Sequence, residues 1–267
     1  VQNFLNDGGA INAICAANDI TLCLVDAGCV GGAFATSNPM LLEHRLGEGT
    51  NDFTVEPAMS RATALDAVAY GVSLAREASF DGAQCLAIGE MGIGNTTSAT
   101  ALFAAFMDFD PAEITGTGTG LTPEGHRHKI AVLRQALDLH KDRLAKGDPI
   151  DVLACLGGFE IAVMCGLLLG VASEHLPVLV DGFIATAAYV VGHTICPTLS
   201  EYAFLTHASA EVGYAKIMER LREQPLLSLS MRLGEGTGAA VEYPLLPAAC
   251  AIFNSMATFT QAGISTK

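Results

Sequence analysis

The sequence predicts an α/β protein with a doubly wound, mainly parallel sheet, helices on both faces and a small helical part formed by the chain ends. Short apolar runs alternate with segments of helical spacing, which is the order of βαβ units. A polar or glycine-rich turn follows these runs, as at the carboxyl ends of parallel strands. The 267 residues are 51% hydrophobic and 16% charged, so one large buried core is possible.

The individual elements follow from local composition. Apolar runs of a few residues that end in polar turns predict strands, and longer segments with apolar residues three and four apart predict helices. The expected strands cover residues 20–25, 84–88, 177–180 and 203–205. The expected helices cover residues 1–18, 59–78, 99–106, 125–144, 183–191 and 239–257, another that ends at Leu221, and two within 150–172 separated at Gly157–Gly158.

Two of these segments make specific expectations about packing. The helix at 59–78 opens at Ser60, and its apolar positions should form one buried face. We expect that face to contain Leu65, Val68, Val72 and Ala75. Residues 33–52 are rich in polar residues, glycine and proline, and are expected to form a loop.

A glycine-rich turn follows the expected strand at 84–88 and leads into a helix, and here we expect the ligand. The N–H groups at a helix start and the close approach that glycine permits both suit an anion. The turn is no Walker A loop, and it only half matches a dinucleotide fingerprint, because Thr97 stands at the third glycine position after Gly92 and Gly94. The alternative is an ordinary tight connection. Glu90 in this turn indicates a polar or cationic group on the ligand as well.

Charge and cysteine content exclude several classes of partner. A net charge of −14 argues against nucleic acid and against an anionic membrane surface. The eight cysteines contain no Cys-x-x-Cys pair, which indicates reduced thiols of a cytoplasmic protein. His126 and His128 would diverge on a helix, so no metal site is expected.

Three charged residues have two possible roles each. Lys129 is either a solvated helix residue or a cation that faces a phosphate or carboxylate. Asp181 either caps the helix that follows it or accepts a hydrogen bond from a ribose hydroxyl. The hexapeptide Arg-Leu-Gly-Glu-Gly-Thr occurs at 45–50 and at 232–237, and only the second copy leads directly into an apolar helix. Glu235 is therefore better placed than Glu48 to act as a base.

Several long motifs, in order, resemble the nicotinate-nucleotide–dimethylbenzimidazole phosphoribosyltransferases. The resemblance spans nearly the whole chain, although a further N-terminal segment usual in that family is not visible before Val1. It implies one phosphoribosyltransferase domain over residues 1–267, with a Rossmann-like core at about 18–235 and terminal helices at about 1–17 and 239–267. The motifs are residues 25–28, 89–99, 157–162, 180–184, 209–211 and 231–240.

The resemblance implies transfer of phosphoribose from nicotinate mononucleotide to 5,6-dimethylbenzimidazole, as in cobalamin lower-ligand assembly. It implies a homodimer and requires neither a metal nor a redox cofactor. Glu235 falls at the position of the base, and Glu90 and Lys129 are the other implied catalytic residues. The implied substrate-binding residues are Met91, Gly92, Gly94, Asn95, Thr96, Thr97, Gly158, Asp181, Gly182, Ser209, Ala210 and Leu233.

The parallel arrangement also predicts where these residues meet. The turns at Asp26, Glu90, Asp181 and Ser209 should converge on one crevice at the carboxyl edge of the sheet. A non-catalytic nucleotide-binding regulatory module that uses the same crevice is the alternative from another class, but it would have no need for a carboxylate between two glycines at residue 235. A Rossmann-type oxidoreductase is disfavoured by the broken fingerprint.

Overall fold

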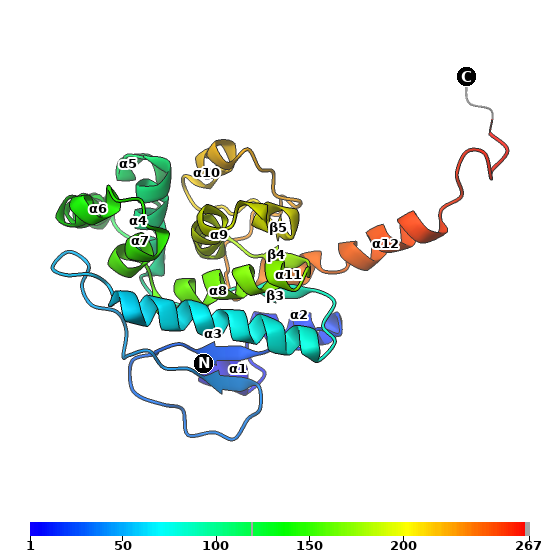
Figure 1. Ribbon diagram of the computed structural model, residues 1–267, viewed down its shortest axis with the longest axis horizontal. Coiled ribbons are helices and arrows are strands. Elements are labelled where there is room, and N and C mark those ends of the chain that lie inside the picture. The colour runs from blue at the N-terminus through cyan, green and yellow to red at the C-terminus, as the bar shows by residue number, and fades with distance from the viewer. Residues whose placement is uncertain (119, 265–267) are drawn as a thin grey trace.

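The computed structural model describes residues 1–118 and 120–264; Thr119 and residues 265–267, the end of the expected C-terminal helical part, lie outside the described residues. Helices make up most of the chain, and short strands are interspersed among them (Figure 1). In chain order the elements are α1 (Gln2–Leu5), α2 (Ala10–Ala17), β1 (Leu24–Asp26), β2 (Leu41–Glu43), α3 (Arg61–Phe80), β3 (Leu86–Ile88), α4 (Asn95–Met107), α5 (Pro111–Ile114), α6 (Pro123–Leu144), α7 (Pro149–Leu156), α8 (Phe159–Ser173), β4 (Val178–Val180), α9 (Phe183–Ile195), the 3-10 helix η1 (Pro197–Glu201), β5 (Ala203–Leu205), α10 (Tyr214–Leu221), α11 (Thr237–Glu242) and α12 (Leu245–Ser255).

All paired strands are parallel, which confirms the α/β class. The main sheet has the order β3-β4-β5, with Leu86 opposite Val178 and Val178 opposite Ala203. The strand expected at 20–25 is observed as β1, which pairs with β2 in a separate two-stranded sheet. The polar segment at 33–52 was expected to be all loop, and this prediction was wrong at β2. Three residues that pair with a distant strand carry no local signal of their own.

The core is built around α8, which is apolar around its whole circumference and is therefore buried on every side. Helix α3 crosses it closely. A Cβ added at Gly166 of α8 would lie 2.0 Å from the backbone oxygen of Val68, and one at Gly71 of α3 would lie 2.1 Å from that of Val163. Glycine at both positions is thus what lets the two helix backbones touch.

The buried face of α3 matches the predicted one only in part. Ala75 is buried as expected, but the other fully buried residues are Ala64, Ala67 and Gly71, and Leu65 is 46% exposed. Small residues face α8 because the close crossing leaves no room for a leucine. Ser60 caps this helix as expected, its side chain accepting a hydrogen bond from the Thr63 N–H.

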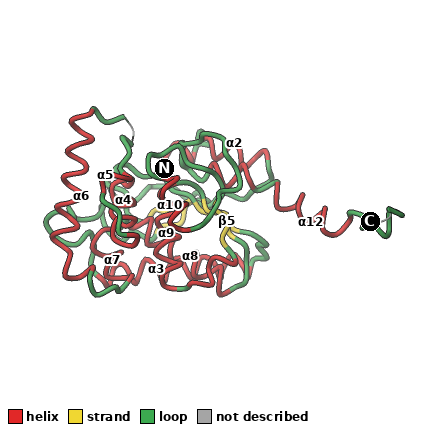
Figure 2. Tube along the Cα trace, turned by 90° about the horizontal axis from the view of Figure 1, so that it is seen from above, coloured by secondary structure: helices red, strands yellow, loops and turns green. Residues whose placement is uncertain are grey.

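Helix α2, near the start of the chain, and helix α11, from its last third, meet beside the main sheet. Helices α2 and α11 contact each other, and Ile11 and Cys15 pack with Ala240 in a small apolar cluster. One final helix was expected over 239–257, and this was wrong: α11 and α12 are separated at Pro244, which cannot continue a helix. Figures 1 and 2 show α12 leading away from the body of the molecule.

The strand ends of the main sheet define one edge. Because β3, β4 and β5 are parallel neighbours, the turns after Ile88, Val180 and Leu205 leave the sheet on the same side. Helices α9 and α11 pack against β4 near this edge. Within residues 1–118 and 120–264, no helix combines the length and the apolar character needed to cross a membrane.

Candidate active site

Two carboxylate-bearing turns, far apart in sequence, lie against each other at this edge. The N–H of Glu235 donates a hydrogen bond of 3.0 Å to the backbone oxygen of Glu90. The contact requires glycine, since a Cβ at Gly89 would lie 2.2 Å from the Cα of Gly236. The Glu90 carboxylate also lies beside Gly234. The structure therefore brings Glu90 and Glu235 to one place.

Glu235 has a strained backbone conformation. Its φ is +62°, in the left-handed region that non-glycine residues seldom adopt, and it lies between Gly234 and Gly236, whose φ angles are also positive. Strain of this kind costs on the order of 1–3 kcal/mol and is concentrated at functional sites. One carboxylate oxygen, Oε2, accepts a long hydrogen bond of 3.4 Å from the N–H of Ile11 at the start of α2.

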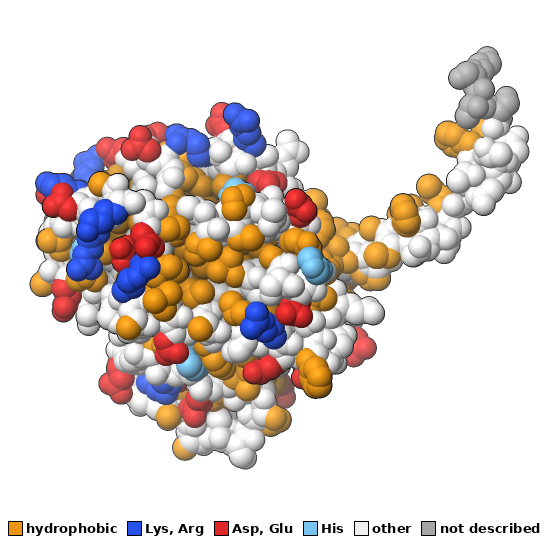
Figure 3. Space-filling model, in the orientation of Figure 1, with side chains coloured by type: hydrophobic (Ala, Val, Ile, Leu, Met, Phe, Trp, Pro, Cys, Tyr) orange, Lys and Arg blue, Asp and Glu red, His pale blue; other side chains and the backbone are white. Residues whose placement is uncertain are grey.

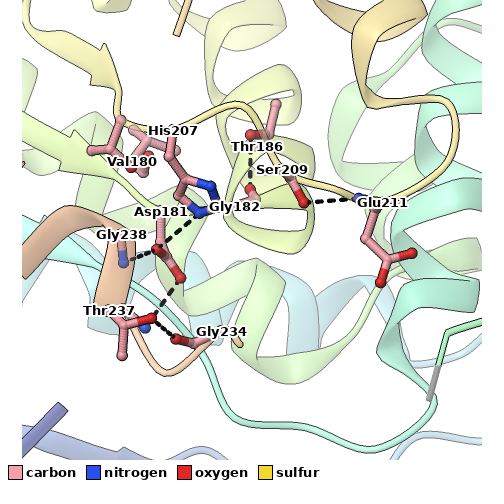
Figure 4. A network of polar contacts seen from close by, with 12 residues as sticks. Val180, Asp181, Gly182, Thr186, His207, Ser209, Glu211, Gly234, Thr237 and Gly238 are labelled. Atoms are coloured by element: carbon pink, nitrogen blue, oxygen red, sulfur yellow. Dashed lines mark hydrogen bonds and ion pairs between the residues drawn. The ribbon is translucent and has the colours of Figure 1, made fainter. Parts of the chain in front are cut away.

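Asp181 fixes the turn that follows Glu235. Its carboxylate is 2% exposed and accepts hydrogen bonds from the N–H groups of Gly236 at 3.1 Å and Gly238 at 2.8 Å (Figure 4). Asp181 thus caps the start of α11, rather than the helix next to it in sequence. Both of its oxygens are engaged in the described structure, so a contact from Asp181 to a ribose hydroxyl stays a prediction.

Asn95 joins Glu90 to a carboxylate that the sequence reasoning missed. Its Nδ2 donates to Glu90 Oε2 at 2.5 Å and to Glu160 Oε1 at 3.2 Å. Burial raises the pKa of Glu90 to about 7; the hydrogen bond from Asn95 opposes this rise, and the charges of Glu160 and Asp181 add to it. Burial also raises the pKa of Glu160, which lies in the first turn of α8 after Gly158. An acidic residue two positions after the Gly157–Gly158 break was the signal in the sequence.

Lys129 is buried, so its alternative as a solvated helix residue is wrong. It is 8% exposed, and its Nζ donates to Thr96 Oγ1 at 2.9 Å. Burial lowers the pKa of this ammonium group, and the charge of Glu211 opposes that effect. No described carboxylate lies within ion-pair distance of Lys129, which leaves a cation on α6 beside the glycine-rich turn.

The remaining predicted residues surround these groups. Ser209 Oγ accepts a hydrogen bond from the Glu211 N–H, and Ala210 N–H donates to the Met231 oxygen, which ties the turn after β5 to the segment before Glu235. Gly182 lies beside Ser209 and His207.

Gly92 and Gly94 shape the turn before α4, whose Thr97 N–H donates to the oxygen of Gly94. Exposed apolar side chains stand in the same turns, and these are Met91, Ile93 and Leu233.

The turn at Asp26 does not offer its carboxylate to this site. Asp26 belongs to the second sheet, is 1% exposed, and accepts hydrogen bonds from the N–H groups of Gly28 and Cys29 and from Arg45. Burial favours a higher pKa for Asp26, but these hydrogen bonds prevail and lower it. The convergence of this turn on the same crevice therefore stays a prediction, because the Asp26 carboxylate is already engaged and Gly28 lies beside Phe159 of α8. Glu48, in the first hexapeptide, is exposed and lies in the loop after β2.

Two surface hollows lie elsewhere. One is lined by residues at the end of α3, including Arg76 and Phe80, and the other by residues around Met107 and Arg220. Neither contains a residue predicted for the site. They are therefore separate from the edge described above.

Known proteins resemble the chain along its whole length. A sequence profile of the family described as phosphoribosyltransferase (DBI_PRT) matches residues 1–264. The nicotinate-nucleotide–dimethylbenzimidazole phosphoribosyltransferase of Solidesulfovibrio magneticus is 51% identical over 265 residues, which are 99% of this chain and 75% of that protein. The enzyme of the same name from a Roseiflexus species is 45% identical over 100% of this chain and 74% of its own length.

A solved structure agrees with these sequences. The crystal structure of CobT from Thermus thermophilus superposes with a TM-score of 0.92 at 40% identity, covering 100% of this chain and 78% of that one. The predicted family, fold class and type of enzyme are thus confirmed. The chain belongs to the nicotinate-nucleotide–dimethylbenzimidazole phosphoribosyltransferase family.

Proposed function

We propose that the chain transfers the phosphoribosyl group of nicotinate mononucleotide to 5,6-dimethylbenzimidazole, giving α-ribazole 5′-phosphate and nicotinate for cobalamin lower-ligand assembly. The observation that carries this assignment is the junction of Glu235 with Glu90 through a backbone hydrogen bond of 3.0 Å at the strand edge. It places the strained turn that carries Glu235 beside the acidic pair, Glu90 and Glu160, which share Asn95. Family membership favours this enzyme over a regulatory module that binds nucleotides without chemistry.

The phosphate of nicotinate mononucleotide binds at Lys129 and at the glycine- and serine-rich turns. Lys129 is buried, cationic and free of a described carboxylate partner, and Thr96 directs its ammonium toward the turn at 92–97. The N–H groups at a helix start attract an anion in the same way. These groups supply local positive charge in a chain whose net charge is −14.

The acidic pair suits a substrate whose nicotinate ring is a pyridinium cation before the bond breaks. Nicotinate leaves as a neutral ring from a pyridinium: the C1′–N bond breaks and its electron pair goes to the ring nitrogen, so no general acid is needed. C1′ gains positive charge as that bond weakens. An ionised Glu90, backed by Glu160 on the other side of Asn95, stabilises this charge where it develops.

Glu235 acts as the base toward the acceptor. One nitrogen of dimethylbenzimidazole attacks C1′ from the face opposite the leaving ring, which converts the β-nucleotide into an α-riboside. The N–H proton of the other nitrogen passes to the Glu235 carboxylate, so the product ring stays neutral. General-base help of this kind contributes about 10²–10⁴ in rate.

Exposed apolar side chains at the edge fit a flat aromatic acceptor. Met91 is 54% exposed, Ile93 96% and Leu233 58%, and they stand in the two turns that carry Glu90 and Glu235. Large apolar groups left open beside polar ones are characteristic of a small-molecule site.

The test is formation of product. The chain is incubated with nicotinate mononucleotide and dimethylbenzimidazole, and both products are measured by chromatography with mass detection. The assignment predicts nicotinate and α-ribazole 5′-phosphate in a one-to-one ratio. If nicotinate mononucleotide binds but neither product appears, the regulatory alternative replaces it.

We propose further that the protein is a cytoplasmic homodimer. All eight cysteines are free, as suits a reducing compartment. Apolar side chains of α12 such as Ile252 and Phe253 are exposed, as is Met256 just after the helix, and Figure 3 shows apolar side chains along the projecting segment. Light scattering coupled to size exclusion should give twice the chain mass of 27.7 kDa, and a mass of one chain would contradict the dimer.

A further inference from the structure

A buried histidine lies behind the Glu235 turn. His207 follows β5, is 3% exposed, and its Nε2 lies 3.5 Å from Asp181 Oδ1. Its backbone is held in place by hydrogen bonds on either side. The Leu227 N–H donates to the Thr206 oxygen, and the Ala208 N–H donates to the Leu227 oxygen. The other ring nitrogen, Nδ1, is buried and has no hydrogen-bond partner within the described parts of the chain.

The ring is packed against the same turn that Asp181 binds. A Cβ at Gly238 would lie 2.0 Å from His207 Cδ2 and 2.7 Å from Asp181 Oδ1. Figure 4 shows the imidazole beside the Asp181 carboxylate, which in turn faces Gly238 and the loop at Gly234. A shift of the ring would therefore move the carboxylate that binds the N–H groups of Gly236 and Gly238, directly after Glu235.

A second buried carboxylate lies near the ring. Glu242, on α11, is 0% exposed, and neither of its side-chain oxygens has a partner among the described residues. Burial raises the pKa of Glu242 to about 7, and the neighbouring His207 opposes this rise. Of these two carboxylates, Asp181 is the one that lies within ion-pair distance of His207 in the described structure.

We propose that His207 is a positioning residue for Glu235: by holding Asp181 it fixes the turn Glu235–Gly238, and with it the carboxylate that accepts the proton from the acceptor base. This role rests on the proposed function of Glu235. In this role His207 does not need to contact the substrate. It matters because a misplacement of about 1 Å can cost about 10²-fold in rate.

The experiment compares two substitutions at His207, alone and combined with Glu235→Gln. His207→Leu introduces an apolar side chain of moderate size and removes the ring N–H, whereas His207→Gln keeps an N–H donor that can reach Asp181. We expect His207→Leu to lower kcat about tenfold or more, with the KM for nicotinate mononucleotide within about twofold. His207→Gln should recover most of the kcat.

The combined variants separate positioning from general packing. If His207 acts through Glu235, then His207→Leu in the Glu235→Gln background should change kcat by less than about twofold, because the group it positions is already gone. An equal loss in both backgrounds, or no recovery in a folded His207→Gln protein, would overturn the proposal. Should His207→Leu fail to fold, His207→Asn, whose amide is too short to reach Asp181, takes its place against His207→Gln. Failure of the proposed function is distinct, since the unsubstituted chain would then form no product.

Discussion

At the scale of single residues, context separates two carboxylates that share one hexapeptide. In the first copy Arg45 binds Asp26 of strand β1, and Glu48 lies in a loop. This copy therefore fastens the loop after β2 to the two-stranded sheet. In the second copy Glu235 has a φ of +62° and bonds to the Glu90 backbone. The same six residues thus serve structure at one place and, in our proposal, chemistry at the other.

Replacing Lys129 tests the phosphate site. Lys129→Ala should raise the KM for nicotinate mononucleotide about tenfold or more, because a charge-assisted contact contributes about 1.5–3 kcal/mol. Lys141→Ala is the matched control: Lys141 lies on the same helix, is exposed and pairs only with Asp138 among the described residues. Initial rates at varied nicotinate mononucleotide give both constants. An unchanged KM in Lys129→Ala would remove this residue from the site.

The raised pKa of Glu90 predicts a pH dependence. Since it is about 7 rather than 4.5, most of this carboxyl is protonated at pH 6 and cannot stabilise positive charge at C1′. The kcat/KM for nicotinate mononucleotide should therefore rise with pH through about 7. Glu90→Gln should be slower and should lose this rise.

The same shift affects stability, which can be measured without substrate. The pKa of the Glu90 carboxyl is higher in the folded state than in the unfolded state. Its contribution to stability is therefore fully present below the ordinary pKa of 4.5 and is lost as pH rises through about 7. Glu90→Gln should therefore gain in melting temperature relative to the unsubstituted chain between about pH 5 and pH 8. A constant difference between the two proteins across that range would refute the assigned burial effect.

At the scale of elements, the site depends on contacts between segments that are distant in the chain. The order of most strands and helices was predictable, because these elements have local signals such as Ser60 at a helix start. The residues that Asp181 binds were not predictable, because the first of the N–H groups that it accepts from lies 55 residues later in the chain. Strand β2 was missed for the same reason, whereas Pro244 was a visible signal that the final helix should break.

The close crossing of α3 and α8 can be tested by adding one methyl group. Gly166→Ala would place Cβ 2.0 Å from the Val68 oxygen, so the helices must separate. We expect a loss of about 1–3 kcal/mol in the free energy of unfolding, measured with urea. Gly125→Ala in α6 is the control, because its Cβ would meet only ordinary contacts from 3.4 Å. Equal stabilities of the two variants would contradict the described crossing.

At the scale of the whole molecule, the site is assembled from nearly every part of the chain. The turns after β3, β4 and β5 meet the start of α11, Lys129 comes from α6, and the start of α2 reaches Glu235 through Ile11. The carboxyl-edge rule predicted the convergence of the three main-sheet turns. It could not predict Glu160 and His207, whose roles depend on packing between elements.

The most direct test of the central claim compares the two carboxylates of the repeated hexapeptide. Glu235→Gln keeps the size of the side chain and removes its charge. We expect turnover to fall about 10²-fold or more, in line with the contribution of a general base, while nicotinate mononucleotide still binds. Glu48→Gln should leave turnover within about threefold. Steady-state assays of the two variants decide the matter: a loss of activity in Glu48→Gln alone, or full activity in Glu235→Gln, would contradict the account.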